Sequence, residues 1–173
     1  MKARAVSAVI RLTLPTIRRM ARPTGTKQIA ENRRARHDYQ LLERYEAGIV
    51  LTGTEVKSLR EGRVTLGQAY ADVRGLEVWL IGAEIAEYTQ GNIANHEPAR
   101  DRKLLLKRHE ITTLHAKVRE KGLTLVPTRL YFKDGKVKLE LAVARGKERI
   151  DKRRDLVAKD AKRQMERALK TRR

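Results

Sequence analysis

The chain contains no cysteine, which excludes a disulfide framework and a thiolate zinc site and fits a reducing compartment. Aromatic residues are scarce as well, at 4% of the 173 residues. All seven lie between positions 39 and 132, so the largest anchors for a core are confined to the middle of the chain. No run of about 18 apolar residues occurs, so the sequence predicts no membrane-spanning helix and no membrane partner.

Acidic residues are absent from the first 30 positions, which hold seven Lys and Arg. Residues 146–173 hold twelve basic and five acidic residues, whereas residues 31–145 are nearly balanced, with 21 basic and 16 acidic. We therefore expect a basic, disordered N-terminal extension at 1–30, a folded domain at 31–145 and a basic tail at 146–173. The net charge of +19 favours a polyanion as partner, because each cation that docks on a phosphate releases counterions.

The middle of the chain has the pattern of a β-protein. Apolar and polar residues alternate over 136–143, the period of a half-buried strand. Asp134-Gly135 joins this segment to the apolar run 123–132, and Asp-Gly favours a tight hairpin turn because both turn positions need positive φ. Pro127 predicts an edge or a bulge, because proline cannot donate a ladder hydrogen bond. We expect further strands at 35–39, at 39–51 with a bend near Gly48, at 66–73 and at 77–81.

Two helices interrupt these strands. Thr52-Gly53-Thr54-Glu55 fits a capping box and Gly62 fits a C-terminal stop, which together predict a short helix. A second helix is predicted by apolar residues at i, i+3 and i+7, although its N-cap is not evident: Ile111, Leu114 and Val118. Five or six short, mainly antiparallel strands with two or three short helices indicate a mainly β protein with a small closed barrel such as an OB-fold, an architecture often used to hold RNA.

Three histidine–acid dipeptides raise the possibility of a metal phosphoesterase: His37-Asp38, His96-Glu97 and His109-Glu110. His109 and the nearby His115 are six residues apart, whereas two imidazoles on one helix face need i, i+4 spacing. The first dipeptide falls on a predicted strand and the second on a predicted loop. The chain also lacks a Gly-rich phosphate loop and a Ser or Cys nucleophile motif. We therefore expect solvated or RNA-facing histidines, with no catalytic residue, no metal site and no cofactor.

A dense series of motifs runs in fixed order from about residue 31 to residue 153. It comprises Ala35-Arg36-His37-Asp38-Tyr39, Tyr45-Glu46-Ala47-Gly48, Leu51-Thr52-Gly53-Thr54-Glu55-Val56-Lys57-Ser58-Leu59-Arg60, Asn95-His96-Glu97-Pro98, Arg100-Asp101-Arg102-Lys103-Leu104-Leu105-Leu106, Glu120-Lys121-Gly122, Ala144-Arg145-Gly146-Lys147 and Asp151-Lys152-Arg153. In these motifs the chain resembles the SmpB family of bacterial tmRNA-binding proteins. The resemblance implies an OB-like barrel without enzymatic activity. It also implies a cytoplasmic, monomeric adaptor, one per tRNA-like domain, that brings tmRNA to the vacant A site of a stalled 70S ribosome for trans-translation.

The same resemblance implies tmRNA contacts at Glu46, Leu105 and Lys136. Lys136 should point away from Val137 and meet a phosphate. Glu46 repels phosphate, so we expect it to orient a neighbouring arginine or to accept hydrogen bonds from base or ribose edges. Leu105 could instead belong to the core, which the sequence alone favours. Three further candidates supply a cation, a hydrogen-bonding ring and a stacking plane for unpaired bases: Arg36, His37 and Tyr39.

The basic tail resembles the family's C-terminal segment, which is disordered when free and helical in the empty mRNA channel of the ribosome. Its apolar stripe is too thin to fold against a core, so ordering entropy would be lost on binding. The ribosome-binding positions would be Asp151, Lys152 and Arg153, facing rRNA of the decoding centre and the mRNA channel. Ile150 precedes them where many relatives carry a polar or aromatic ring, so the role of that ring stays open here.

Residues 1–30 lie outside the resemblance, and three interpretations of them stay open. They are a transit peptide, an extension upstream of a true start at Met20, or a solvated basic arm. For the function, the leading hypothesis is the tmRNA adaptor. The alternative is a general OB-type, ribosome-associated RNA-binding protein, for which the charge and the barrel suffice, and the third hypothesis is the metal phosphoesterase.

Overall fold

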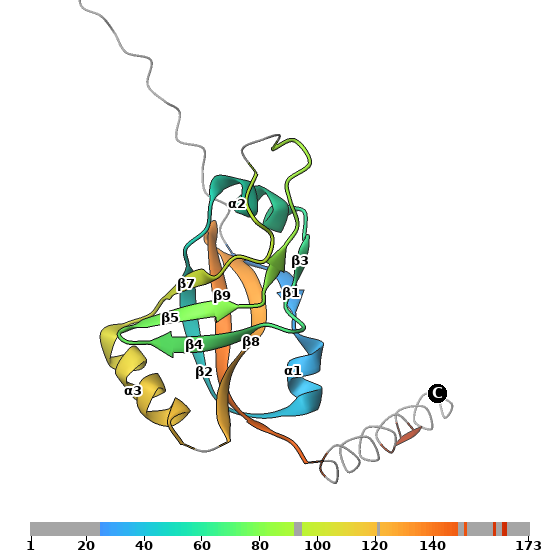
Figure 1. Cartoon of the computed structure of the whole chain (residues 1–173). Helices are drawn as coiled ribbons and strands as arrows, with labels where there is room; N and C mark the ends of the chain where they lie inside the picture. Colours follow the sequence, from blue (N-terminus) through green and yellow to red (C-terminus); the bar gives the residue numbers. More distant parts are fainter. Residues whose placement is uncertain are drawn as a thin grey trace, which may run out of the picture.

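The computed structural model describes residues 25–91, 95–120 and 122–148, together with positions 151, 161, 164 and 165 (Figure 1). The elements follow in the order β1 (Thr26–Glu31), α1 (Arg33–Asp38), β2 (Tyr39–Ile49), α2 (Gly53–Arg60), β3 (Val64–Thr65), β4 (Tyr70–Arg74), β5 (Glu77–Ile81), β6 (Glu84–Ile85), β7 (Arg102–Leu105), α3 (Arg108–Val118), β8 (Leu123–Lys133) and β9 (Lys136–Gly146). Among the described residues, no helix has the length and apolar character that crossing a bilayer requires.

Six strands close into a barrel. They are hydrogen-bonded in the order β8-β4-β5-β7-β2-β9, and β9 pairs back with β8. Every one of these pairings is antiparallel. Figure 1 shows α2 at one end of the barrel and α1 and α3 toward the other. The expected mainly β fold with a small OB-like antiparallel barrel is confirmed.

The turn and bulge signals of the long β8–β9 hairpin are also confirmed. Asp134 and Gly135 have φ values of 49° and 75°, the positive values that a two-residue hairpin turn demands. The register between the two strands shifts between Pro127 and Arg129, so the proline lies at a bulge, in a strand that pairs with β9 on one side and with β4 and β1 before and after the proline on the other. The hairpin therefore tolerates the missing N–H without losing its ladder.

The predicted strand over 35–39 is wrong, because residues 33–38 form α1. Asn32 caps this helix: its side-chain oxygen accepts a hydrogen bond from the Ala35 N–H at 3.0 Å. The same side chain donates to the Leu66 carbonyl at 2.8 Å, so the cap is tied to the loop before β4. Ala35 is buried beside Val126 and Ala144. This long-range contact and the cap decide the local structure in favour of a helix.

The expected boundary at residue 31 is also wrong, since β1 lies within the segment assigned to a disordered extension. β1 pairs antiparallel with β8, with Thr26 opposite Lys133 and Gln28 opposite Tyr131. Ile29 and Ala30 pack against the main core. The strand expected at 66–73 is also shorter than predicted. The two-residue strand β3 ends at Thr65, the chain then turns, and it enters the larger sheet at Tyr70, where β4 begins. The remaining part of the predicted extension, residues 1–24, lies outside the described residues.

A fully buried ion pair joins α2 to β7. Glu55 and Arg102 are both 0% exposed, and the Arg102 Nε donates to Glu55 Oε1 at 2.8 Å. Arg102 also donates to the carbonyls of Ala83, Arg100 and Pro98 at 2.5, 3.0 and 2.9 Å. The Glu55 carboxylate therefore ties α2 to a loop that is remote in sequence.

The remaining lone pairs of Glu55 are also used. The Thr52 N–H donates to Oε2 at 2.7 Å, as the capping box predicts, and Arg100 donates to both carboxylate oxygens at 2.9 and 2.5 Å. Burial by itself raises the pKa of the Glu55 carboxyl, but the hydrogen bonds from Arg100, Thr52 and Arg102 outweigh it, so the pKa lies below the ordinary 4.5. The carboxylate therefore stays charged at neutral pH.

We predict that Arg102→Met lowers the free energy of unfolding by about 3–5 kcal/mol, because it leaves the Glu55 charge buried with one partner fewer. The matched control is Arg74→Met, since Arg74 is also on a strand but its side chain is half exposed beside Asp72 and Asp101. We expect the control to stay within about 1 kcal/mol of the unsubstituted protein. Urea unfolding followed by circular dichroism measures both, and equal effects would contradict the structural role assigned to the buried pair.

Candidate nucleic-acid interface

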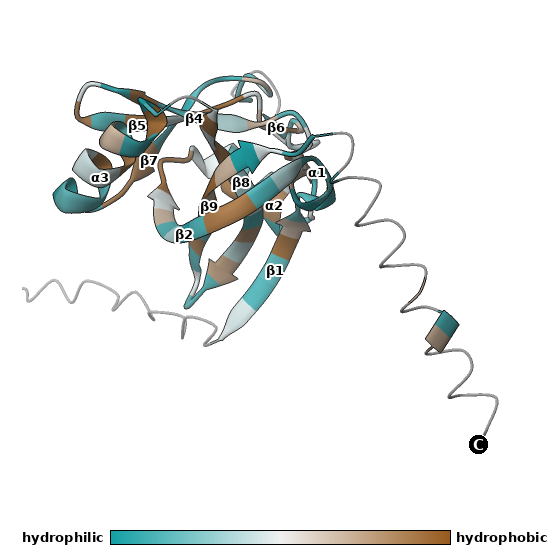
Figure 2. Ribbon diagram, turned by 90° about the horizontal axis from the view of Figure 1, so that it is seen from below, coloured by the Kyte–Doolittle hydropathy of each residue, from teal (hydrophilic) through white to brown (hydrophobic). Residues whose placement is uncertain are grey.

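The outer face of the barrel carries a row of residues that pair directly across five strands. In order they are Leu105, Gly48, Lys138, Tyr131 and Gln28, on β7, β2, β9, β8 and β1. Because side chains alternate along a strand, residues two positions away on each strand share this face. Figure 2 shows hydrophilic and hydrophobic stretches along β2 and β1. Leu104, Leu130 and Leu139, which neighbour the row in sequence, are buried in the core.

Glu46 lies at the centre of this face and binds three side chains. Its Oε2 accepts a hydrogen bond from the Tyr131 hydroxyl at 2.7 Å and one from Lys133 Nζ at 2.9 Å. Its Oε1 lies 3.3 Å from Lys133 Nζ and 3.6 Å from Lys138 Nζ. Glu46 therefore orients two lysines and a tyrosine, and the arginine that we expected as its partner is not among the contacts found for it.

The Glu46–Tyr131 contact changes the protonation behaviour of both groups. Hydrogen bonds from Tyr131 and Lys133 lower the pKa of Glu46 below its ordinary value, so the carboxylate stays ionised. Burial and the hydrogen bond to Glu46 raise the pKa of Tyr131 to about 12, so its hydroxyl stays a donor. The face thus combines cations with one fixed negative acceptor.

Leu105 and Lys136 lie on this same face, so the structure brings together the three positions that the resemblance assigned to tmRNA. Leu105 is 53% exposed, and the preference for a core position is wrong. A Cβ added at Gly48 would lie 3.2 Å from the Leu105 Cβ, so Leu105 covers a site that has no side chain of its own. Lys136 is exposed at the start of β9 while the adjacent Val137 packs against the core, as expected.

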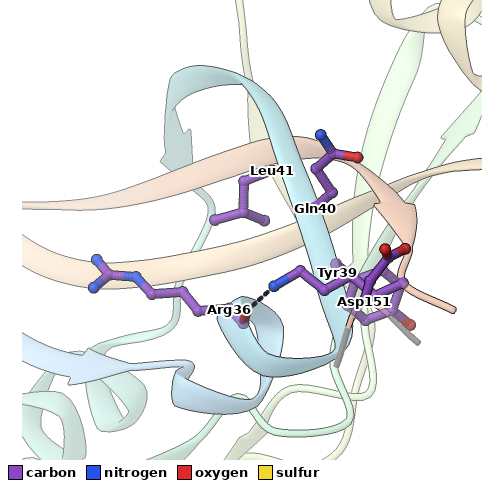
Figure 3. Close-up of a pocket in the computed structure, with 6 residues that line it drawn as sticks. Arg36, Tyr39, Gln40, Leu41 and Asp151 are labelled. Atoms are coloured by element: carbon purple, nitrogen blue, oxygen red, sulfur yellow. Dashed lines mark hydrogen bonds between the residues drawn. The ribbon is translucent and has the colours of Figure 1, made fainter. Parts of the chain in front are cut away.

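Arg36, His37 and Tyr39 form a separate group around α1. Arg36, Tyr39 and Asp151 help to line a hollow of about 470 Å³, shown in Figure 3. Lys147, also in its wall, donates to the Arg36 carbonyl at 3.0 Å. His37 is exposed, with its Nδ1 2.9 Å from Asp38 Oδ1.

The two groups lie at different places along the same strand. Tyr39 and Glu46 are seven positions apart on β2, which is roughly 23 Å at the rise of a strand. Asp151 is helical and exposed, whereas Ile150, Lys152 and Arg153 lie outside the described residues.

The histidines have no metal-binding arrangement within the described ranges. No group of three or more His, Asp or Glu residues there could hold a metal ion. His96 is buried, with Nδ1 2.9 Å from Thr54 Oγ1 and Nε2 3.1 Å from the Ile85 carbonyl. It therefore joins α2 to the strand β6, and the expectation of a solvated or RNA-facing histidine is wrong at this position.

Sequence reasoning missed several polar residues of the outer face. Arg129, Tyr131 and Lys133 occupy every second position on β8 and alternate with the apolar Leu130 and Phe132. This period-2 pattern was available in the sequence. Gln28 could not be found in that way, because it belongs to the part of the chain without aromatic anchors.

Comparisons with known proteins give one consistent family. The family model described as "SmpB protein" matches residues 29–171. The SsrA-binding protein of Thermobifida fusca is 58% identical over 149 residues, covering 86% of this chain and 93% of that protein. That of Symbiobacterium thermophilum is 57% identical over 155 residues, covering 88% and 98%. A chain of the solved structure "tmRNA-SmpB: a journey to the center of the bacterial ribosome" is 53% identical, with a TM-score of 0.60, over 69% of this chain and 85% of that chain.

The neighbours Leu104 and Leu105 give a matched test of which side chain belongs to the core. Leu104→Ala should lower the free energy of unfolding by about 2–5 kcal/mol, because it leaves a cavity among buried side chains. Leu105→Ala should cost less than about 1 kcal/mol, because its side chain is largely in solvent already. Chemical denaturation measures both values. A large loss for Leu105→Ala would place its side chain in the core after all.

The Tyr131 hydroxyl should titrate near pH 12, whereas Tyr131 in Glu46→Gln should titrate closer to the ordinary value of 10. Burial and this hydrogen bond hold the folded pKa above the unfolded one, so the stability linked to the protonated hydroxyl is fully present below pH 10 and is lost as the pH rises through 12. The measurement is the tyrosinate absorbance difference between the protein and Tyr131→Phe at rising pH. A Tyr131 pKa that Glu46→Gln does not lower would contradict the hydrogen bond.

Proposed function

The chain belongs to the SmpB protein family, and from that premise we propose that it is an RNA-binding adaptor that binds the tRNA-like domain of tmRNA and delivers it to the A site of stalled ribosomes for trans-translation. The observation that carries the proposal is the convergence of Glu46, Leu105 and Lys136 on one outer face of the barrel. These residues come from three strands and are up to 90 positions apart in sequence. The relatives named SsrA-binding proteins support the same partner.

The face has the chemistry that an RNA surface requires. Lys133, Lys136 and Lys138 can meet phosphates, and Leu105 offers an apolar contact for a base or ribose. Selective RNA recognition by such a surface also needs a group that is not a cation, and Glu46 supplies an acceptor for base or ribose edges. A general OB-type RNA-binding protein would need the charge and the barrel alone, whereas the family match extends through the tail to residue 171.

We assign the second group, around α1, and the tail to the ribosome. Arg36, Tyr39 and Asp151 line the hollow (Figure 3), and the exposed His37 follows Arg36 in the sequence. The tail continues from there with twelve basic residues over 146–173, a composition suited to rRNA. In this proposal Asp151, Lys152 and Arg153 act at the decoding centre, and the tail becomes helical in the mRNA channel. The protein works as a monomer in the cytoplasm and has no enzymatic activity of its own.

Lys136→Ala should weaken binding of the purified tRNA-like domain by about 1–3 kcal/mol, the range for a hydrogen bond to a charged group. The slope of log affinity against log salt should fall by about 1, because one phosphate contact is lost. The unfolding free energy should hardly change, because the side chain is exposed. Lys27→Ala is the control, since it removes an equal charge from β1 at an exposed position outside the group formed by Glu46, Leu105 and Lys136. Equal affinities for the two variants would count against the outer face as the RNA site.

Truncation after Glu148 should separate binding from delivery. This end point keeps Lys147, whose N–H donates to the Asp38 carbonyl at 2.9 Å, so α1 retains its contact with the chain beyond β9. We expect the truncated protein to bind the tRNA-like domain almost as tightly as the full chain. In a reconstituted translation system with stalled ribosomes it should fail to support peptide tagging. Tagging at the full rate would show that the tail has no role in delivery.

A further inference from the structure

The outer side of β4, β5 and β7 differs in chemistry from the neighbouring face that we assign to RNA. Tyr70 on β4 lies opposite Ile81 on β5. Trp79 on β5 lies between Asp72 on β4 and Lys103 on β7. The alternate residues of these strands pack into the core, so the side chains named here point outward. Figure 1 shows β4 and β5 with none of the described helices in front of them, which leaves this face open to a partner.

Apolar and aromatic side chains form the centre of this face. Trp79 and Ile81 are partly exposed, and Tyr70 is 46% exposed. Val50 adds to the group from β2, because its N–H donates to the Lys103 carbonyl at 3.0 Å and its side chain is exposed. Tryptophan and tyrosine on a surface, next to aliphatic residues, are typical of protein–protein contacts, in which a few such anchors supply most of the binding energy.

The charged residues of this face disfavour RNA and define the partner. Its three acids and two cations give a net charge of −1, in a chain whose net charge is +19: Asp72, Glu77, Asp101, Arg74 and Lys103. Lys103 pairs with Glu77. Arg74 is shared, at 3.4 Å from Asp72 and 3.1 Å from Asp101. One carboxylate charge therefore stays uncompensated beside the apolar centre, where it would repel a phosphate and attract a cation.

We propose that this face docks on a basic ribosomal protein, with an apolar side chain of that protein against Trp79 and Ile81 and an arginine or lysine beside Asp72. The inference rests on the proposed function, because RNA and ribosomal proteins surround the ribosomal A site. Ribosomal proteins are largely basic, since they neutralise rRNA phosphates, so electrostatic complementarity selects them over RNA at this face. Leu105, two positions after Lys103 on β7, belongs to the proposed RNA face, so the protein can hold tmRNA and this partner side by side.

The first test is photo-crosslinking on purified, stalled 70S ribosomes loaded with tmRNA and the full-length protein. A benzophenone amino acid is placed at position 79 and, in a second protein, at position 136. We expect position 79 to crosslink to a basic ribosomal protein and position 136 to crosslink to tmRNA. A crosslink from position 79 to RNA, or none from it while position 136 reaches tmRNA, would overturn the inference and leave the proposed function standing. If position 136 does not reach tmRNA either, the proposed function fails and the inference fails with it.

The second test is the affinity of the tmRNA–protein complex for stalled ribosomes. Asp72→Lys should lower it by about tenfold, the size of a contact near the centre of a protein interface, and leave the affinity for the isolated tRNA-like domain unchanged. Because the variant is more basic, unspecific attraction to rRNA would raise the ribosome affinity instead. Glu84→Lys is the control, an equal charge change at an exposed position on β6, and should lower neither affinity. Thermal unfolding checks that both variants fold. Equal ribosome affinities for the two variants, or a loss of tRNA-like-domain binding in Asp72→Lys, would overturn the inference.

Discussion

The buried ion pair between Glu55 and Arg102 is the constraint on which the outer face proposed to bind RNA depends. Arg102 is held by a carboxylate and three backbone carbonyls, so its direction on β7 is fixed. Side chains on a strand alternate, and a slip by one residue would exchange the two faces. With Arg102 and Leu104 inside, Lys103 and Leu105 must lie outside. A polar interaction in the interior thereby places an apolar residue on the exterior, where it is available to a ligand.

The same pair explains why a short helix and a long loop can close one end of a small barrel. Glu55 caps its own helix through Thr52 and at the same time satisfies two arginines that follow the loop. Buried ion pairs contribute little net stability, because desolvation opposes the attraction. Their directional hydrogen bonds nevertheless specify one arrangement of α2, the segment around Pro98 and β7. We infer that this pair serves the uniqueness of the fold more than its stability.

Much of the architecture could be predicted because its signals are local. The Asp134-Gly135 turn, the alternation in β9 and the capping box before α2 each depend on residues close together in sequence, and each is present. The elements that were mispredicted depend on distant partners. α1 forms because Asn32 reaches Leu66 and Ala35 packs beside Val126, and the position of Leu105 follows from the burial of Arg102. Such contacts leave no local pattern, so the outer face could be assigned only in part from the sequence.

The central claim is that the barrel selects one RNA by its outer face, and capture of RNA from living cells tests it most directly. The full-length protein and the double variant Glu46→Ala with Lys136→Ala are crosslinked to RNA in the host by ultraviolet light, purified under denaturing conditions and sequenced. The account predicts that tmRNA is strongly enriched with the unsubstituted protein and that the double variant loses this enrichment while it retains background rRNA. A broad mixture of rRNA and mRNA without enriched tmRNA, for the unsubstituted protein, would contradict the account.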